Sequence, residues 1–235
     1  MDEITKLALH QYCDVLECKT TADWAQLPDL GLYMDQVITY LERQLDIFVK
    51  PGGESSMTPS MINNYVKAKI VPRAEGKKYR QEHIALLLAV FTLKRVLSMQ
   101  DLVLLLGSSE GKNVRDGGEE GSGAGHGVEE AKGFYERFRR SVELSAKATS
   151  AALGNALASS LADGEDSDEE SRRLLDERRL RDLALEFSVE ASVKSYAAEM
   201  LLALANPAGR AAITAATTRE KKGQAERRKG KKASS

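Results

Sequence analysis

The segment from Met57 to Leu106 constrains the fold of this chain more than any other part of it. Thr58 is a good helix N-cap and Pro59 a good first helical residue, because proline lacks the N–H that would be unpaired there. Pro72 cannot continue a helix and disfavours helical geometry at the residue before it. The sequence therefore predicts a short helix over residues 59–70.

The two faces of this short helix differ in chemistry. One face carries residues that can pack inward: Ile62, Tyr65, Val66 and Ile70. The opposite face carries Ser60, Asn63, Asn64 and Lys67. Asparagine can bond bidentately to adenine in the major groove and lysine neutralises phosphate. We therefore expect the outward face to read bases and phosphates of DNA.

A basic loop comes next, around Gly76, and Tyr79 leads from it into another helix. Positive charge extends around this loop on Lys69, Arg73, Lys77, Lys78 and Arg80, interrupted by Glu75. Such a loop would suit a wing that grips the DNA backbone beside the groove. The alternative is an ordinary lysine-rich turn next to a solvated helix face, since short basic loops are common on protein surfaces.

Apolar residues at three-and-four spacing predict further helices. Residues 3–18 form one, and a second begins near Met34 and continues until Pro51-Gly52-Gly53 ends it. After the basic loop, residues 84–93 are apolar almost all round, so that helix must be covered on more than one side and we infer a partner helix. A turn at Leu97-Ser98 precedes a short helix over residues 99–106.

The C-terminal half is organised differently. Residues 107–127 are mainly Gly, Ser and charged residues and show no apolar periodicity, which indicates a flexible linker. A helix over residues 128–161, an acidic run over 163–170 and a further helix predict an antiparallel hairpin. Beyond Asn206-Pro207 the chain is Ala-rich and then basic, and we expect disorder there.

Composition limits the class of protein. A chain of 235 residues can bury a core without disulfides or metals, and its abundant Ala, Leu, Glu, Lys and Arg favour a mainly α fold. The formal net charge is -1, so only the distribution of charge bears on partners. Cys13 and Cys18 have the spacing of neither a redox pair nor a zinc knuckle, which favours a reducing compartment. A metal site joining His10 to Cys13 is an alternative to unremarkable thiols on a helix.

Several classes of function are disfavoured. The first residues lack the regions of a signal peptide, and the most apolar run, residues 84–91, is far shorter than the roughly 20 residues that a bilayer span needs. We therefore expect a cytoplasmic protein without a membrane segment. The sequence shows no recognisable nucleophile with a base and no carboxylate cluster, so we expect neither enzymatic activity nor a cofactor. His83, in the first turn of a helix, is expected to pack or to form hydrogen bonds.

Three segments carry a family resemblance: Leu32-Tyr33-Met34-Asp35-Gln36-Val37-Ile38, Met61-Ile62-Asn63-Asn64-Tyr65-Val66-Lys67 and Tyr79-Arg80-Gln81-Glu82-His83-Ile84. In combination, over about residues 24–106, they resemble the bacterial domain-of-unknown-function family numbered 1836 (DUF1836). That family is similar to the MerR-type winged helix-turn-helix regulators. The resemblance implies a recognition helix, a wing and a tyrosine that opens the next helix. The chain departs from MerR regulators at Asn63, where they usually carry Arg, and at Lys69, where they carry Gly.

The resemblance implies a MerR-like winged helix-turn-helix domain with a C-terminal helical hairpin in a mainly α protein. We expect an N-terminal helix (1–22), the DNA-binding domain (24–107), a flexible linker (108–127), a hairpin for dimerisation or regulation (128–206) and a disordered basic tail (207–235). The tail could add sequence-independent affinity for nucleic acid or be an inert solubilising segment.

The function that we expect is that of a bacterial, nucleoid-associated transcriptional regulator that binds double-stranded DNA as a homodimer. Its recognition helix is expected at 59–70 and its wing at 72–79. Ser60, Asn63, Asn64 and Lys67 would face the major groove, while Arg73, Lys77, Lys78 and Arg80 hold phosphates and Lys69 adds positive charge. The alternative is an interaction module that has kept the helix-turn-helix shape but binds protein through its Leu-rich helices and acidic loop. The sequence names no effector ligand.

Overall fold

The computed structural model describes residues 3–18, 21–45, 57–107, 127–162 and 169–215. These residues form α1 (Glu3–Cys18), the 3-10 helix η1 (Trp24–Gln26), α2 (Met34–Gln44), α3 (Pro59–Lys67), α4 (Gln81–Leu93), α5 (Met99–Leu106), α6 (Val128–Ala162) and α7 (Glu169–Ala205). The described residues also contain two isolated antiparallel β-bridges, Leu32 with Tyr79 and Glu75 with Lys78. The mainly α prediction is confirmed.

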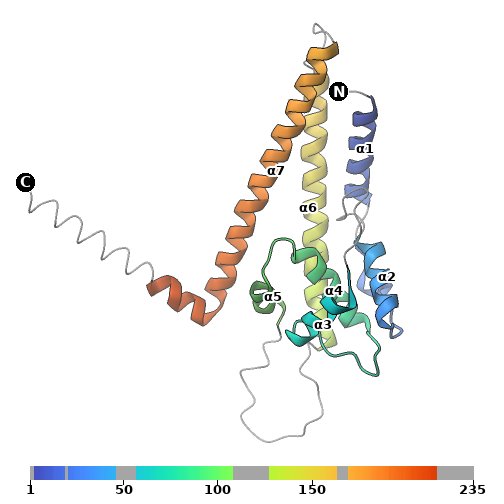
Figure 1. Ribbon diagram of the computed structural model, residues 1–235, viewed down its shortest axis with the longest axis vertical. Helices are drawn as coiled ribbons and strands as arrows, with labels where there is room; N and C mark the ends of the chain where they lie inside the picture. The colour runs from blue at the N-terminus through green and yellow to red at the C-terminus, as the bar shows by residue number, and fades with distance from the viewer. Residues whose placement is uncertain (1–2, 19–20, 46–56, 108–126, 163–168, 216–235) are drawn as a thin grey trace, which may run out of the picture.

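The short helices α2 to α5 gather around one end of α6, and α1 lies along the other part of α6 (Figure 1). α4 is the centre of this cluster, because its residues from Ile84 to Val90 are almost fully buried. α2, α5 and α6 cover it. α6 is therefore the partner helix that the all-round apolar character of residues 84–93 predicted, and it adds Tyr135 and Phe138 to the core.

α6 and α7 run antiparallel, as predicted for a hairpin, but each packs mainly against other helices (Figure 1). α6 packs against α1 and α4, and Ser150 on α6 donates a 2.7 Å hydrogen bond to the Glu17 carboxylate on α1. α7 packs against α5, where the Ser195 hydroxyl donates a 2.9 Å hydrogen bond to the carbonyl of Val96. Ala198 and Leu202 of α7 also pack on the core.

The predicted disorder from residue 207 onward is wrong for residues 207–215, which are helical. Asn206 begins this helix: its side-chain oxygen accepts a 3.1 Å hydrogen bond from the N–H of Ala208, and its carbonyl accepts a 2.9 Å bond from the N–H of Arg210. Asparagine is a strong N-cap and proline is favoured at the first helical position. The Asn-Pro pair that ends α7 therefore also starts the next helix. Residues 216–235 lie outside the described residues.

Other boundaries differ from the predicted ones. α2 ends at Gln44, well before Pro51, and residues 46–56 lie outside the described part of the chain. α3 ends at Lys67, three residues before the predicted end at Ile70. The predicted linker (108–127), apart from Gly127, and most of the acidic run (residues 163–168) also lie outside the described residues.

In the described part of the chain, no helix is both long enough and apolar enough to cross a membrane.

Candidate nucleic-acid interface

α3 presents one apolar and one polar face, as its sequence predicted. Its N-cap Thr58 accepts a 3.4 Å hydrogen bond from the N–H of Met61. Ile62 and Tyr65 are buried, and the Tyr65 ring meets Phe91 of α4 edge to face with centroids 5.7 Å apart. The outward residues Ser60, Asn63, Asn64 and Lys67 are exposed. The helix is thus fixed to the core by its inner face while its outer face stays accessible.

The end of α3 has a specific backbone geometry at Lys69, whose φ is 59°. The N–H of Ile70 bonds to the carbonyl of Tyr65 at 3.0 Å, and the N–H of Lys69 bonds to the carbonyl of Val66 at 3.1 Å. This is a Schellman motif, in which the residue after the C-cap is left-handed and is usually glycine. The chain therefore makes a turn that usually contains glycine with a lysine instead.

The basic loop forms a tight hairpin turn. Gly76 and Lys77 have φ values of 56° and 64°, and the N–H of Lys78 bonds to the carbonyl of Glu75 at 3.0 Å. Two consecutive positive φ values are those of a type I′ turn, whose twist matches that of paired strands. Lys77 is therefore at the tip of the turn, on a defined backbone.

The base of this turn is braced by the segment that precedes α2. Leu32 and Tyr79 exchange two backbone hydrogen bonds, each 2.8 Å long. Gly31 lies so close to the turn that a Cβ on it would be 2.9 Å from the Cβ of Lys78. The Nζ of Lys78 also lies 5.7 Å from the centre of the Tyr33 ring. This brace was not predicted, because it depends on pairing between residues that are distant in the sequence.

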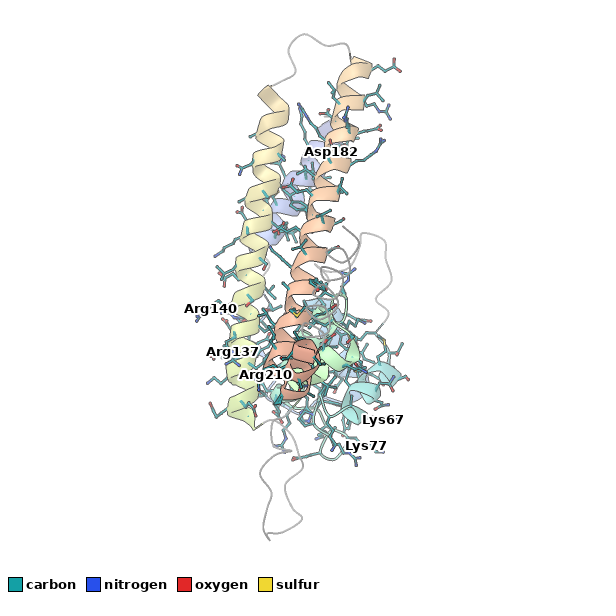
Figure 2. The ribbon with its side chains drawn as sticks, turned by 90° about the vertical axis from the view of Figure 1, so that its left-hand side faces the viewer. Lys67, Lys77, Arg137, Arg140, Asp182 and Arg210 are labelled. Carbon is teal, nitrogen blue, oxygen red and sulfur yellow. The ribbon has the colours of Figure 1, made fainter. Side chains whose placement is uncertain are left out.

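All of the predicted DNA-contacting residues are exposed: Ser60, Asn63, Asn64, Lys67, Lys69, Arg73, Lys77, Lys78 and Arg80. Lys67 and Lys77 lie near each other at one end of the molecule, far from Asp182 on α7 (Figure 2). The Arg80 guanidinium is paired with the Glu75 carboxylate at 2.9 Å. Glu75, which interrupts the positive charge in the sequence, therefore also neutralises one of its cations in space.

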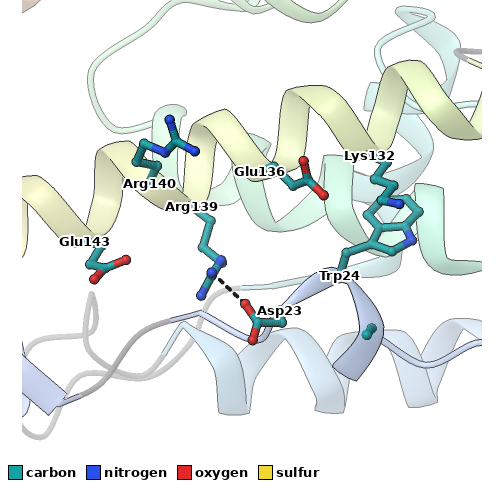
Figure 3. A pocket seen from close by; sticks show the side chains of 8 residues that line it. Asp23, Trp24, Lys132, Glu136, Arg139, Arg140 and Glu143 are labelled. Atoms are coloured by element: carbon teal, nitrogen blue, oxygen red, sulfur yellow. Dashed lines mark ion pairs between the residues drawn. The ribbon is translucent and has the colours of Figure 1, made fainter.

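A second feature that sequence reasoning did not identify is a charged cavity between η1 and α6 (Figure 3). It has a volume of about 520 Å³ and is lined by Asp23, Trp24, Ala25, Lys132, Glu136, Arg139, Arg140 and Glu143. An ion pair of 2.6 Å between Arg139 and Asp23 spans it. Its cations and carboxylates are equal in number, which gives no preference for a ligand of either charge.

The structure bears on the predicted alternative of a metal site at His10 and Cys13. The Nδ1 of His10 lies 2.8 Å from the carbonyl oxygen of Lys6, one turn earlier in the same helix. Within the described ranges, no group of three or more His, Cys, Asp or Glu side chains is arranged to hold a metal ion.

Comparison with known proteins identifies one family. Residues 22–138 match the model of a domain of unknown function, DUF1836. This segment is a DUF1836 domain. No curated protein and no solved structure matches the chain. The resemblance found in the sequence is confirmed for this family, and the DUF1836 domain extends past Leu106 to include the first turns of α6.

The bounds of the DUF1836 domain agree with its core. The Tyr135 hydroxyl, on the first turns of α6, donates a 2.8 Å hydrogen bond to the carbonyl of Ala22 at the other end of the matched segment. α4 would lose part of its cover without these turns. The start of α6 therefore packs with the core of the family domain, although the sequence assigned it to the hairpin.

Proposed function

We propose that the DUF1836 domain binds double-stranded DNA as a winged helix-turn-helix, and that the protein is a non-enzymatic transcriptional regulator of the bacterial cytoplasm. α3 would enter the major groove, and the wing (residues 72–79), with the turn at 75–78 as its tip, would contact the backbone. The observation that carries this proposal is the shared exposure of the outer face of α3 and of the basic wing at one end of the molecule (Figure 2).

The chemistry of that surface supports the proposal. Asn63 and Asn64 can pair with adenine edges, and lysines on the helix and wing can neutralise phosphates on either side of a groove. Both elements are held on a rigid frame, because α3 is anchored on α4 and the wing is paired with Leu32. The left-handed turn at Lys69 supports the proposed likeness to MerR regulators, which place glycine there.

A homodimer is part of the proposal, and α7 is its proposed interface. One side of α7 packs on α5, while the side turned away from that contact carries an apolar stripe at three-and-four spacing. The stripe consists of Leu185, Val189, Val193, Tyr196 and Leu204, with exposed fractions of 42% to 65%. A surface helix normally keeps that side polar. We propose that the same stripe of a second copy covers it.

A protein-binding module is the second candidate, and the outer face of α1 favours it. Ile4 and Leu7 on that face are 82% and 60% exposed, although α1 packs against α6 through its other side. Exposed apolar side chains on a packed helix suit a protein partner. This alternative requires no DNA contact at all.

Titration of the purified protein against random-sequence duplex DNA at low and moderate salt separates the two candidates. A DNA-binding protein loses affinity steeply as salt rises, because bound phosphates release counterions. Replacing Lys77 and Lys78 with Ala should weaken binding to all sequences and flatten the salt slope by roughly 1.8 for two lost phosphate contacts. Replacing Arg137 and Arg140, two cations on α6, removes the same charge away from the wing and serves as the control (Figure 2).

Equal losses in both double variants would mean that binding follows net charge and has no defined surface. If no binding occurs at either salt concentration, the interaction module becomes the better account.

A further inference from the structure

We infer that His83 is the positioning residue of the wing and that it holds the wing in place only while its imidazole is neutral. This inference rests on the proposed function, since it concerns the regulation of the same DNA-binding surface. His83 is 3% exposed and lies in the first turn of α4, directly after the wing.

The imidazole joins both ends of the wing to α4. Its Nδ1 accepts a 3.0 Å hydrogen bond from the backbone N–H of Arg80, where the chain leaves the wing. Its Nε2 lies 3.3 Å from the backbone carbonyl of Arg73, where the chain enters the wing. The ring also meets Tyr79 edge to face, with centroids 5.6 Å apart. One side chain thus contacts the entry, the exit and the base of the wing.

The two backbone bonds are both satisfied by only one protonation state of the ring. A backbone N–H can only donate and a carbonyl can only accept, so these two bonds together require Nδ1 without a proton and Nε2 with one. That is a neutral tautomer. Protonation would place a second N–H on the ring, and Nδ1 could no longer accept the bond from Arg80.

The charged neighbours of the ring determine how protonation would affect the wing. Arg73 and Glu75 belong to the wing, and Arg80 follows it as the N-cap of α4. Glu82 precedes His83 on α4, with its Oε1 3.3 Å from Nδ1. The contact with the His83 side chain, the largest cause, lowers the pKa of Glu82, so this carboxylate is ionised at neutral and mildly acidic pH. A protonated Nδ1 would donate to Glu82 and release Arg80. The wing then loses its attachment at the exit while the core remains intact.

The predicted consequence is weaker DNA binding at acidic pH. A loosened wing must be ordered again when it binds, which costs conformational entropy. We expect an affinity loss of about five- to tenfold from neutral to acidic pH at constant salt, the size of one hydrogen bond. A simple charge effect has the opposite sign, because added positive charge on a protein strengthens its binding to DNA.

The test measures duplex affinity against pH for the full chain and for two variants. His83→Gln keeps a donor and an acceptor but does not titrate, so it should bind DNA with an affinity that stays flat over this range. His10→Gln, at an exposed histidine on α1, should keep the pH profile of the unchanged protein. A flat or rising affinity toward acid in the unchanged protein would overturn the inference.

Nuclear magnetic resonance of the free protein separates this inference from the proposed function. The ring nitrogens of His83 should report the tautomer with the proton on Nε2, and the amide proton of Arg80 should shift along the titration curve of His83. Titration of His83 without a change at Arg80 would disprove the coupling, whatever the protein binds. A coupled titration in a protein that binds no DNA would instead leave the inference standing and remove the proposed function.

Discussion

The hydroxyl of Tyr135 donates a 2.8 Å hydrogen bond to the backbone carbonyl of Ala22, and so joins the two ends of the DUF1836 segment. Tyr135 is fully buried, and its ring lies between Trp24, at 6.2 Å, and Phe138, at 6.1 Å, measured between centroids. The contact attaches the first turns of α6 to the segment that leads into η1. The stability of the domain should therefore depend on this residue.

Tyr135 should make the protein sensitive to alkaline pH. Desolvation by burial raises the pKa of its hydroxyl to about 12, whereas the pKa of a tyrosine in an unfolded chain is about 10. The unfolded chain thus loses this proton at lower pH than the folded protein, so stability is fully present below about pH 10 and falls as pH rises toward 12. The measurement is chemical denaturation at a series of alkaline pH values.

Tyr135→Phe should weaken this pH dependence and also lower the free energy of unfolding at neutral pH, by about 1–3 kcal/mol, because the Ala22 carbonyl loses its donor. Tyr12→Phe, at an exposed tyrosine on α1, is the matched control and should change stability by less than about 0.5 kcal/mol. An alkaline profile identical in the unchanged protein and in Tyr135→Phe would contradict the role of this hydroxyl.

Gly31→Ala should displace the wing. The added Cβ would stand 2.9 Å from the Cβ of Lys78, which is closer than side-chain carbons approach, and Lys78 is part of the hairpin turn. We expect reduced affinity for duplex DNA with the helical content unchanged by circular dichroism. Gly133→Ala is the control, since the nearest atom to its added Cβ is the Arg137 Nη1 at 3.6 Å and alanine favours a helix by roughly 0.5–1 kcal/mol. Equal affinity in the two variants would show that the brace at Gly31 does not position the wing.

Lys69→Gly should stabilise the fold while weakening DNA binding. The φ of 59° at Lys69 costs a residue with a Cβ about 1 kcal/mol, which glycine avoids. The same change removes an exposed positive charge beside α3. Thermal unfolding should shift upward and the salt slope of binding should become flatter. Lys67→Gly removes a charge at the end of the helix itself and should lower stability by up to about 1 kcal/mol. A loss of stability in Lys69→Gly would contradict the strain at this position.

The apolar stripe on α7 should set the oligomeric state. Val193→Glu and Tyr196→Glu place charges in the middle of the stripe, and sedimentation equilibrium should change from dimer to monomer. Ser188→Glu adds the same charge on the same helix off the stripe and should leave the dimer intact. If the unchanged protein is already a monomer at micromolar concentration, the proposed interface is wrong.

The amino-acid sequence determined the local structure around the candidate site. Thr58 and Pro59 start α3 as predicted, and the helix over residues 99–106 has the bounds of α5. The division of α3 into a buried and an exposed face was also predictable from its spacing. These features could be predicted because they depend on capping chemistry and periodicity within a few residues along the chain.

Only the tertiary structure decided how these pieces meet. The apolar character of α4 predicted a helix packed against it, but not that this helix is α6. The sequence also placed His83 at the start of a helix, but not its contacts with Arg73 and Arg80. The pairing of Leu32 with Tyr79 was equally invisible. Such contacts join residues that are distant in the sequence, and their free energy depends on how the whole chain closes around the core, which no local pattern encodes.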